Sequence, residues 1–162
     1  MTERAVVAAL REAGSSVATA ESLTGGLVCA TLVSVPGASE VVRGGVVAYA
    51  SDVKIDVLGV DADLVAANGV VDAHVATEMA VGARLRLGAT YGVSTTGVAG
   101  PEPSEGKPVG TVHVAVAGPG DQVVHTELAL TGDRETIRRE TVSAVLSLLL
   151  DRVREESTTT RR

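Results

Sequence analysis

The stretch Ala20-Glu21-Ser22-Leu23-Thr24-Gly25-Gly26 places a hydroxyl, a carboxylate and two glycines between two segments of different character. Residues 16–20 before it are small and compatible with a strand, whereas residues 27–33 after it form an apolar run. This order predicts a strand, a turn and a helix, with Ser22 at or near the helix N-cap. The unpaired amides of a first helical turn, beside two glycines, would then suit an anion or a developing oxyanion.

The same stretch has a simpler interpretation. A serine that precedes an apolar helix is usually only a helix cap, because its side-chain oxygen satisfies an amide of the first turn. Ser22 alone therefore does not indicate catalysis, and the other segments of the chain must be considered with it.

The composition limits the possible classes of protein. The 162-residue chain is predicted to form one domain over residues 1–155, followed by a flexible polar tail at 156–162. Phe and Trp are absent, so we expect an aliphatic core. The formal net charge of -6 argues against binding to nucleic acid, and the single Cys29 excludes an internal disulfide and a multi-thiolate zinc site. With no signal-peptide pattern and no membrane-length apolar run, we expect a soluble cytoplasmic protein that does not bind membranes.

Helical and strand-like segments alternate along the first two thirds of the chain, and a hairpin follows. The predicted strands cover residues 16–20, 41–50, 91–96, 110–117 and 122–130, and the predicted helices cover 2–14, 27–33, 51–59, 61–67, 72–87 and a final segment from Asp133. This order predicts an α/β fold, namely a three-layer α/β/α sandwich with a mixed, mostly parallel sheet. Ligands bind such sheets at the carboxyl ends of the strands, so Ser22, segment 49–54 and segment 96–100 are expected to converge.

The final helix carries a wide apolar surface. Leu146, Leu150 and Val153 broaden its main apolar stripe, which predicts burial on two sides. We therefore expect a homo-oligomer, with a dimer favoured.

Tyr49 and Lys54 place a phenol at a strand end and an amine in the first turn of the next helix. A lysine can take the proton of a serine if burial keeps its amine neutral, and a phenol beside them can relay that proton. From the spacing alone, a solvated Lys54 and a Tyr49 that fills the core are the more ordinary interpretation.

Two further segments could bind substrate. The loop Thr96-Gly97-Val98-Ala99-Gly100 could hold a phosphate, ribose or carbonyl oxygen with its amides, although an ordinary turn has the same composition. Arg134 and Arg138 lie one helical turn apart near a helix N-terminus, where a phosphate would be favoured, but pairing with neighbouring glutamates in solvent is equally compatible. His113 and His125 are expected on the hairpin strands, and no histidine spacing indicates a metal site.

Four ordered motifs together resemble the CinA C-terminal domain family over about residues 3–154. The motifs are Ala20–Gly26, Tyr49–Lys54, Thr96–Pro101 with Lys107–Val112, and Gly132–Arg134. The enzymatic members of that family are nicotinamide-nucleotide amidohydrolases, also called NMN deamidases. The resemblance implies hydrolysis of the carboxamide of nicotinamide mononucleotide, a small-molecule nucleotide, to nicotinate mononucleotide and ammonia. The larger N-terminal domain of full-length CinA proteins has no counterpart in the sequence, so the stand-alone form is expected.

The resemblance also implies the roles of single residues. Ser22 matches the nucleophile, Lys54 its general base and Tyr49 the assisting phenol, while the segment from Thr96 to Gly100 matches the substrate-binding loop. Our own additions to the substrate-binding set are Thr24, Gly25, Gly26, Arg134 and Arg138. Two positions depart from the family pattern: Leu23 replaces a common cysteine, and Ser51 replaces a common asparagine that could help to order the site. No metal and no cofactor is expected.

Two other functions fit parts of the sequence. A non-catalytic nucleotide-binding module would keep the same loops without turnover. Hydrolysis of a pyrophosphate bond would fit the glycine loop and the arginines, but it normally requires a carboxylate cluster that holds a divalent cation, and the sequence indicates none.

Overall fold

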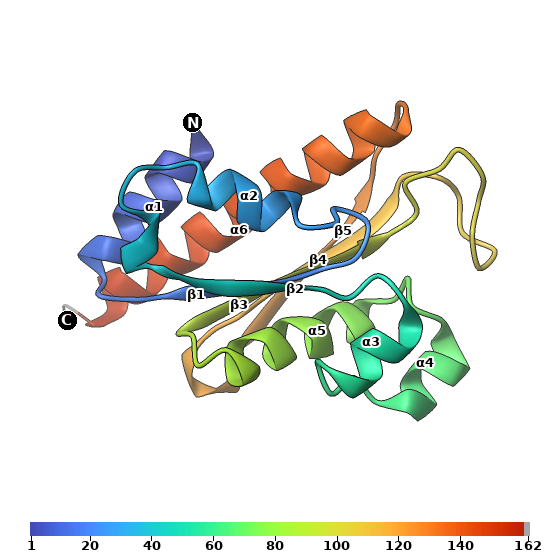
Figure 1. Ribbon diagram of the computed structural model, residues 1–162, viewed down its shortest axis with the longest axis horizontal. Helices are drawn as coiled ribbons and strands as arrows, with labels where there is room; N and C mark the ends of the chain where they lie inside the picture. Colours follow the sequence, from blue (N-terminus) through green and yellow to red (C-terminus); the bar gives the residue numbers. More distant parts are fainter. Residues whose placement is uncertain (161–162) are drawn as a thin grey trace.

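The structure is a computed structural model that describes residues 1–160 and has helices on both faces of a central sheet (Figure 1). The strands are β1 (Val17–Glu21), β2 (Val42–Val47), β3 (Tyr91–Gly97), β4 (Thr111–Ala117) and β5 (Val123–Ala129). The helices are α1 (Thr2–Glu12), α2 (Leu27–Val33), α3 (Ser51–Asp56), α4 (Ala62–Asn68), α5 (Ala73–Arg86) and α6 (Arg134–Thr160), with short 3-10 turns at Ala38–Glu40 and Pro119–Asp121. The predicted three-layer α/β/α sandwich is therefore confirmed.

The sheet brings three strand ends to one edge. Its order is β2-β1-β3-β4-β5, in which β1 pairs in parallel with β2 and β3, and β4 is antiparallel to β3 and β5. Glu21, the last residue of β1, is in register with Val47 of β2 and Thr95 of β3. The segments that follow β1, β2 and β3 therefore begin side by side, as the predicted convergence requires.

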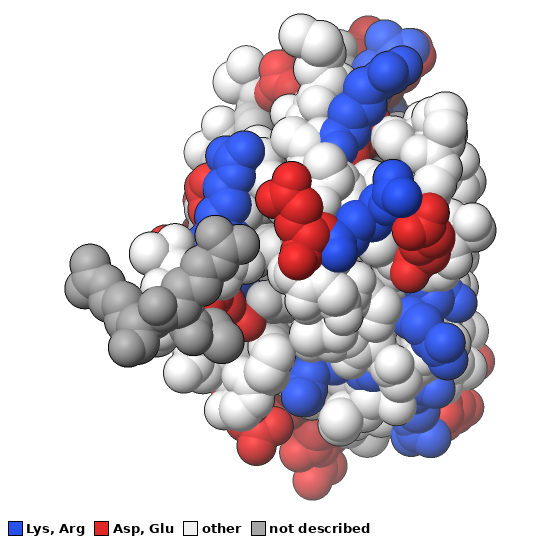
Figure 2. All heavy atoms as spheres, turned by 90° about the vertical axis from the view of Figure 1, so that its left-hand side faces the viewer, with Lys and Arg blue, Asp and Glu red and all other residues white. Residues whose placement is uncertain are grey.

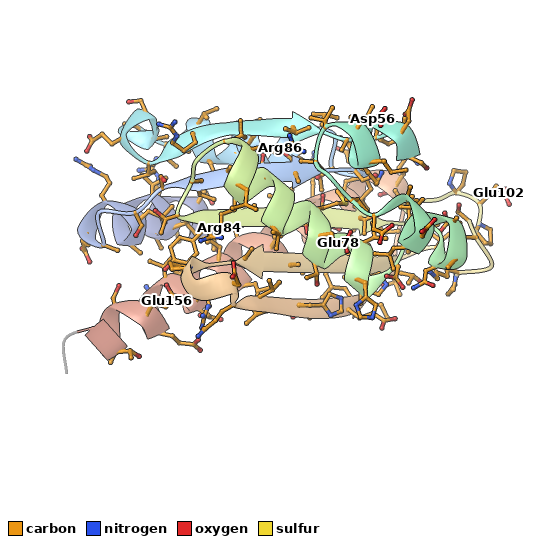
Figure 3. All side chains as sticks on the ribbon, turned by 90° about the horizontal axis from the view of Figure 1, so that it is seen from below. Asp56, Glu78, Arg84, Arg86, Glu102 and Glu156 are labelled. Carbon is orange, nitrogen blue, oxygen red and sulfur yellow. The ribbon has the colours of Figure 1, made fainter. Side chains whose placement is uncertain are left out.

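Aliphatic clusters on both faces of the sheet hold the layers together. Helices α1, α2 and α6 cover one face of the sheet, and α5 with α3 and α4 covers the other (Figure 1). Seen from below, α5 lies along its face of the sheet (Figure 3). Helix α5 approaches the sheet closely because Gly92 of β3 faces it: a Cβ at Gly92 would lie 2.0 Å from the carbonyl oxygen of Ala80. The side chains of α5 that pack on the sheet include the small residues Ala76 and Ala80, which are fully buried.

The second apolar stripe of α6 is buried within the chain. Leu146, Leu150 and Val153 belong to the same core cluster as Val6 and Leu10 of α1, and α1 packs against α6. This stripe therefore gives no argument for an oligomer, and the homo-oligomer stays a prediction. Helix α6 continues to Thr160, so residues 156–160 of the predicted tail are helical and the remainder of that tail lies outside the described residues.

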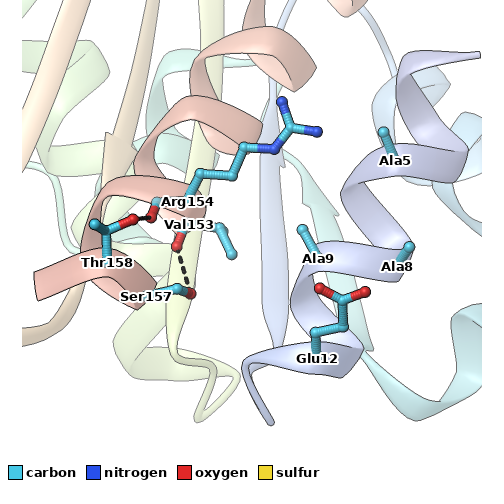
Figure 4. Close-up of a pocket in the computed structure, with 8 residues that line it drawn as sticks. All are labelled: Ala5, Ala8, Ala9, Glu12, Val153, Arg154, Ser157 and Thr158. Carbon is cyan, nitrogen blue, oxygen red and sulfur yellow. Dashed lines mark hydrogen bonds between the residues drawn. The ribbon is translucent and has the colours of Figure 1, made fainter. Parts of the chain in front are cut away.

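The end of the molecule opposite the three strand ends has a different character. A cavity of about 690 Å³ lies there between α1 and the last turns of α6, where Ala5, Ala8 and Ala9 leave room (Figure 4). Acidic and basic side chains alternate over this end, so no single charge dominates it (Figure 2). Among the described helices, none has both the length and the apolar character of a membrane-spanning segment.

Candidate active site

Ser22 lies in a turn rather than at a helix cap. Strand β1 ends at Glu21 and α2 begins only at Leu27, with Gly26 as its N-cap, so the prediction that Ser22 is at the N-cap was wrong. Gly25 and Gly26 have φ angles of 58° and 101°, in the left-handed region that glycine adopts without strain. The two glycines therefore add a tight turn between strand and helix, and Ser22 stands at its start, 8% exposed.

The amides of α2 do not form the predicted anion site. The carboxylate of Glu21, which is 1% exposed, accepts hydrogen bonds from the amides of Val28 (2.7 Å) and Cys29 (3.0 Å) and from the hydroxyl of Thr19 (3.3 Å). A negative charge from the chain itself thus compensates the positive end of α2. An oxyanion beside Ser22 must be held by other donors.

Such donors remain in the turn itself. Within residues 1–160, the amides of Leu23, Thr24 and Gly26 donate to no protein acceptor, whereas the amide of Gly25 donates to the carbonyl oxygen of Ser22. The amides of Ala99 and Gly100 in the glycine loop also have no acceptor among the described residues. Unpaired amides close to a nucleophile are the donors that an oxyanion hole uses.

Lys54 is the buried partner of Ser22. Its Nζ lies 3.0 Å from Oγ of Ser22, 2.7 Å from the carbonyl oxygen of Ala48 and 3.1 Å from the carbonyl oxygen of Tyr49. The side chain is fully buried although it belongs to the six-residue helix α3, so the interpretation of a solvated Lys54 is excluded. Burial lowers the pKa of Lys54 to about 8, while the carboxylate of Glu105 acts in the opposite direction.

The surroundings of Lys54 orient its amine. A neutral amine has two N–H groups and one lone pair, and two carbonyl oxygens lie within hydrogen-bonding distance of Nζ. If Ala48 and Tyr49 accept the two hydrogens, the lone pair points at Oγ of Ser22, and the serine hydroxyl donates to it. The backbone thus prepares Lys54 to remove the serine proton.

The phenol of Tyr49 takes a different place from the predicted one. Tyr49 is 62% exposed, so it does not fill the core, and its hydroxyl accepts a hydrogen bond from Arg134 (3.2 Å). Its contact with Lys54 is through its backbone carbonyl group. No relay is needed between Ser22 and Lys54, because these two side chains are in direct contact.

The two predicted arginines join the segments of the site. Arg134 donates to the carbonyl oxygen of Gly100 (2.6 Å) as well as to Tyr49, and so connects the glycine loop with the end of β2. Arg138 donates to the carbonyl oxygens of Leu23 (2.9 Å) and Thr24 (3.1 Å), and so holds the turn that carries Ser22. The first two turns of α6 therefore fix the loops that follow β1, β2 and β3.

The remaining predicted binding residues lie at the same sheet edge, and several of them hold neighbouring segments. The hydroxyls of Thr24 and Thr95 are 2.7 Å apart and buried, which ties the Ser22 turn to β3. The hydroxyl of Thr96 donates to the carbonyl oxygen of Val70 (2.8 Å). At Gly97 a Cβ would lie 2.7 Å from the carbonyl oxygen of Thr111, so β4 leaves no room for a side chain there.

The glycine loop ends at two buried residues. Ala99 is 5% exposed, and Gly100 has a φ of 87° with Val109 packed where a side chain would be. His113 and His125 lie on β4 and β5 as predicted, with Nδ1 of the first 2.9 Å from Nε2 of the second.

Comparison with known proteins shows the family of this chain. The family model of the CinA C-terminal domain matches residues 1–153. The chain belongs to the CinA C-terminal domain family. A CinA-like protein from Frankia casuarinae is 51% identical over 147 residues, which are 91% of this chain and 34% of the relative. A putative competence-damage inducible protein from Desulforamulus reducens is 47% identical over 90% of this chain and 35% of its own length. The chain thus spans about a third of the length of these CinA relatives.

Solved CinA structures have the same fold. The competence/damage inducible protein CihA from Agrobacterium tumefaciens superposes with a TM-score of 0.89 at 38% identity, and the match covers 93% of this chain and 92% of that one. A CinA superfamily protein from Klebsiella pneumoniae superposes with a TM-score of 0.92 at 31% identity, covering 95% and 96% of the two chains. The names of these CinA proteins refer to competence and damage, and they state no reaction.

Sequence reasoning missed three contributions to the site. Glu21 was quoted only as a neighbour of Ser22, because no local pattern shows that its carboxylate accepts hydrogen bonds from the amides of α2. The carbonyl groups of Ala48 and Tyr49 carry no sequence signal, because every residue has one. Glu105 lies more than fifty positions from Lys54, and only the folded chain brings its charge into range.

Proposed function

We propose that this chain hydrolyses the carboxamide of nicotinamide mononucleotide to nicotinate mononucleotide and ammonia, through an acyl-enzyme formed on Ser22. The observation that carries the proposal is the 3.0 Å contact between Oγ of Ser22 and Nζ of a fully buried lysine, Lys54. Membership of the CinA family supports the nature of the substrate, since the enzymatic members that the motifs resemble act on this nucleotide.

The first half of the reaction forms the acyl-enzyme. Neutral Lys54 removes the hydroxyl proton, and Oγ of Ser22 attacks the carboxamide carbon, so that a C–O bond forms and the carbonyl oxygen becomes an oxyanion. The unpaired amides of Leu23 and Thr24 are the donors nearest to Ser22 in sequence, and one such donor lowers a barrier by about 3 kcal/mol. Protonated Lys54 then gives its proton to the departing nitrogen, the C–N bond breaks, and ammonia leaves.

The second half releases the product. A water molecule loses a proton to neutral Lys54 and attacks the acyl carbon, and Oγ of Ser22 recovers its proton as it leaves. Nicotinate mononucleotide is the carboxylic acid that results. Each proton that Lys54 accepts is returned within the cycle. Hydrolysis changes no oxidation state, so the reaction needs no redox partner.

Arg134 is the better candidate of the two arginines for the substrate phosphate. Arg134 is exposed, and its guanidinium group donates to the phenol of Tyr49 and to the carbonyl oxygen of Gly100. The phosphate of the nucleotide can replace the exposed phenol as a hydrogen-bond acceptor for this group. Arg138 is half-buried and already holds two carbonyl oxygens of the Ser22 turn. We therefore assign Arg138 to the turn and Arg134 to the nucleotide.

Release of ammonia from nicotinamide mononucleotide tests the proposal. We expect activity in the wild type, unchanged by a chelator, and a decrease on the order of 10³-fold or more in both Ser22→Ala and Lys54→Met. Ser39→Ala is the control, because Ser39 is exposed and lies in the 3-10 turn Ala38–Glu40 before β2, at the other end of that strand from the site. An active Ser22→Ala protein would refute the acyl-enzyme, and a wild type that binds the nucleotide without turnover would identify a binding module instead.

A further inference from the structure

The segment 101–108, here called the 101–108 loop, leaves the end of the glycine loop and ends in a tight turn. The amide of Ser104 donates to the carbonyl oxygen of Lys107 (3.2 Å), and the amide of Lys107 donates back to Ser104 (2.9 Å). Glu105 and Gly106 between them have φ angles of 54° and 72°, as a type I′ turn requires. A left-handed backbone is unfavourable for a glutamate, so other contacts must hold Glu105 there.

Those contacts attach the loop to the connection between α4 and α5, here called the 69–71 turn. The carboxylate of Glu105 accepts hydrogen bonds from the amides of Val70 (3.0 and 3.1 Å) and Val71 (3.1 Å). Lys107 donates from the same loop to the carbonyl oxygen of Val71. Gly69 permits the close approach, because a Cβ there would lie 2.4 Å from the carboxylate of Glu105. Glu105 and Lys107 of the 101–108 loop thus form hydrogen bonds with consecutive peptide groups of the 69–71 turn.

The attachment continues to the sheet edge that carries the site. Thr96, which lies in β3 and is the first residue of the glycine loop, donates to the carbonyl oxygen of Val70. The 69–71 turn is therefore held from β3 on one side and from the 101–108 loop on the other. Disruption of the Glu105 contact would leave the hydrogen bond from Lys107 to Val71 as the remaining side-chain attachment of the loop to this turn.

The same carboxylate acts on Lys54. Burial and the charge of Glu105 affect the pKa of Lys54 in opposite directions, and burial has the larger effect. Two other charged groups lie beside the contact between Glu105 and the 69–71 turn: Lys107, which donates to Val71, and Asp72, the next residue after Val71. Both also act on the pKa of His113. Lys54 has no hydrogen bond to any of these groups, so Glu105 influences it through space.

We propose that Glu105 is a positioning residue of the amidohydrolase site: its contact with the 69–71 turn holds the 101–108 loop beside the site and keeps a carboxylate in range of Lys54. This inference rests on the proposed function and deepens it. The negative charge stabilises the protonated amine that exists after the serine proton has been transferred.

Two variants and one control test the inference. Glu105→Gln keeps the size of the side chain and removes its charge, and Glu105→Ala removes the contact with Val70 and Val71 altogether. Glu102→Gln is the matched control, because it makes the same charge change on the same loop and makes no hydrogen bond among the described residues. Figure 3 shows Glu102 at the outer end of the loop, away from the sheet.

The first measurement is the pH dependence of kcat/KM for ammonia release. Loss of the carboxylate should lower the pKa of Lys54, so in Glu105→Gln the acidic limb of the profile should move down by roughly half a pH unit. A loss of folding or packing alone would lower kcat/KM at every pH without moving the acidic limb of the profile. Glu102→Gln should follow the wild type, and a Glu105→Gln profile with an unmoved limb would overturn the proposal.

The second and third measurements do not depend on turnover. NMR titration of the Lys54 side chain should show the same downward shift in Glu105→Gln, and amide hydrogen exchange at Val70 and Val71 should accelerate by about tenfold in Glu105→Ala. Unchanged exchange or an unchanged lysine titration would refute the role of Glu105. If both effects appear but the wild type releases no ammonia, the assigned reaction fails, while the roles of Glu105 in holding the 101–108 loop and in shifting the pKa of Lys54 stand.

Discussion

The burial of Lys54 makes a prediction about stability that is independent of any reaction. Its pKa is lowered from 10.5 to about 8 by burial in the folded chain. Between these two values the unfolded chain holds a proton on Lys54 and the native chain does not, so stability must rise with pH in that window. Below pH 8 both states are protonated, and the cost of burying the charge is present in full.

The size of the effect follows from the two pKa values. Integration of the linkage relation from pH 7 to pH 9.5 gives a relative gain in unfolding free energy of about 2 kcal/mol for the group that titrates. Lys54→Met has no such group, so the unfolding free energy of the wild type should rise by that amount relative to the variant over the same range. The comparison cancels the other titrating groups, which the two proteins share.

Urea denaturation followed by far-ultraviolet circular dichroism measures this difference, since the chain contains no Trp to report by fluorescence. Both proteins are unfolded at several pH values from 7 to 9.5. Parallel curves for the wild type and Lys54→Met would show that the amine keeps its ordinary pKa in the folded state. The argument for a neutral base would then be lost as well.

Three further substitutions test the supports of the Ser22 turn. Glu21→Gln should lower the unfolding free energy by about 2 kcal/mol, because one amide of α2 then faces an NH₂ group; the exposed Glu12→Gln is its control, and equal thermal melting of the two variants would contradict this role. Arg138→Ala should reduce kcat by about tenfold or more with less change in KM, as steady-state ammonia release can measure; a change in KM alone would instead indicate that Arg138 binds substrate. Thr24→Val should cost about 1–2 kcal/mol in urea denaturation, since it leaves the buried hydroxyl of Thr95 without its partner; wild-type stability would show that this hydrogen bond contributes nothing net.

Much of the fold could be predicted because its signals are local. The helix of residues 73–86 begins after Asp72, whose carboxylate accepts from the amides of His74 and Val75. The alternation of helices and strands predicted the layers, and the general rule for parallel strands predicted which loops converge. The bounds of α2 were predicted correctly, but the placement of Ser22 at its N-cap was wrong, because a serine at a strand end and a serine at a helix cap look the same in sequence.

The residues of the site could be predicted from the sequence, but their hydrogen-bond partners could not. Ser22 and Lys54 were recognisable as a possible pair, yet the spacing equally allowed a lysine in solvent. Tyr49 was expected to assist the proton transfer, and in the fold its phenol turns toward Arg134. Such partners come from segments that are far apart in the sequence and close together only in the fold, so no local sequence pattern predicts them.

The sequence by itself determined the order of the elements, the aliphatic core and the set of polar residues at three strand ends, since each of these depends on neighbours within a few positions. Only the tertiary structure decided that Lys54 is buried with two carbonyl groups around its amine, that Glu21 rather than a ligand occupies the amides of α2, and that two arginines of α6 hold the loops together. The physical reason is that desolvation and hydrogen-bond geometry depend on all the segments that surround a side chain in the fold. No single segment of sequence determines them.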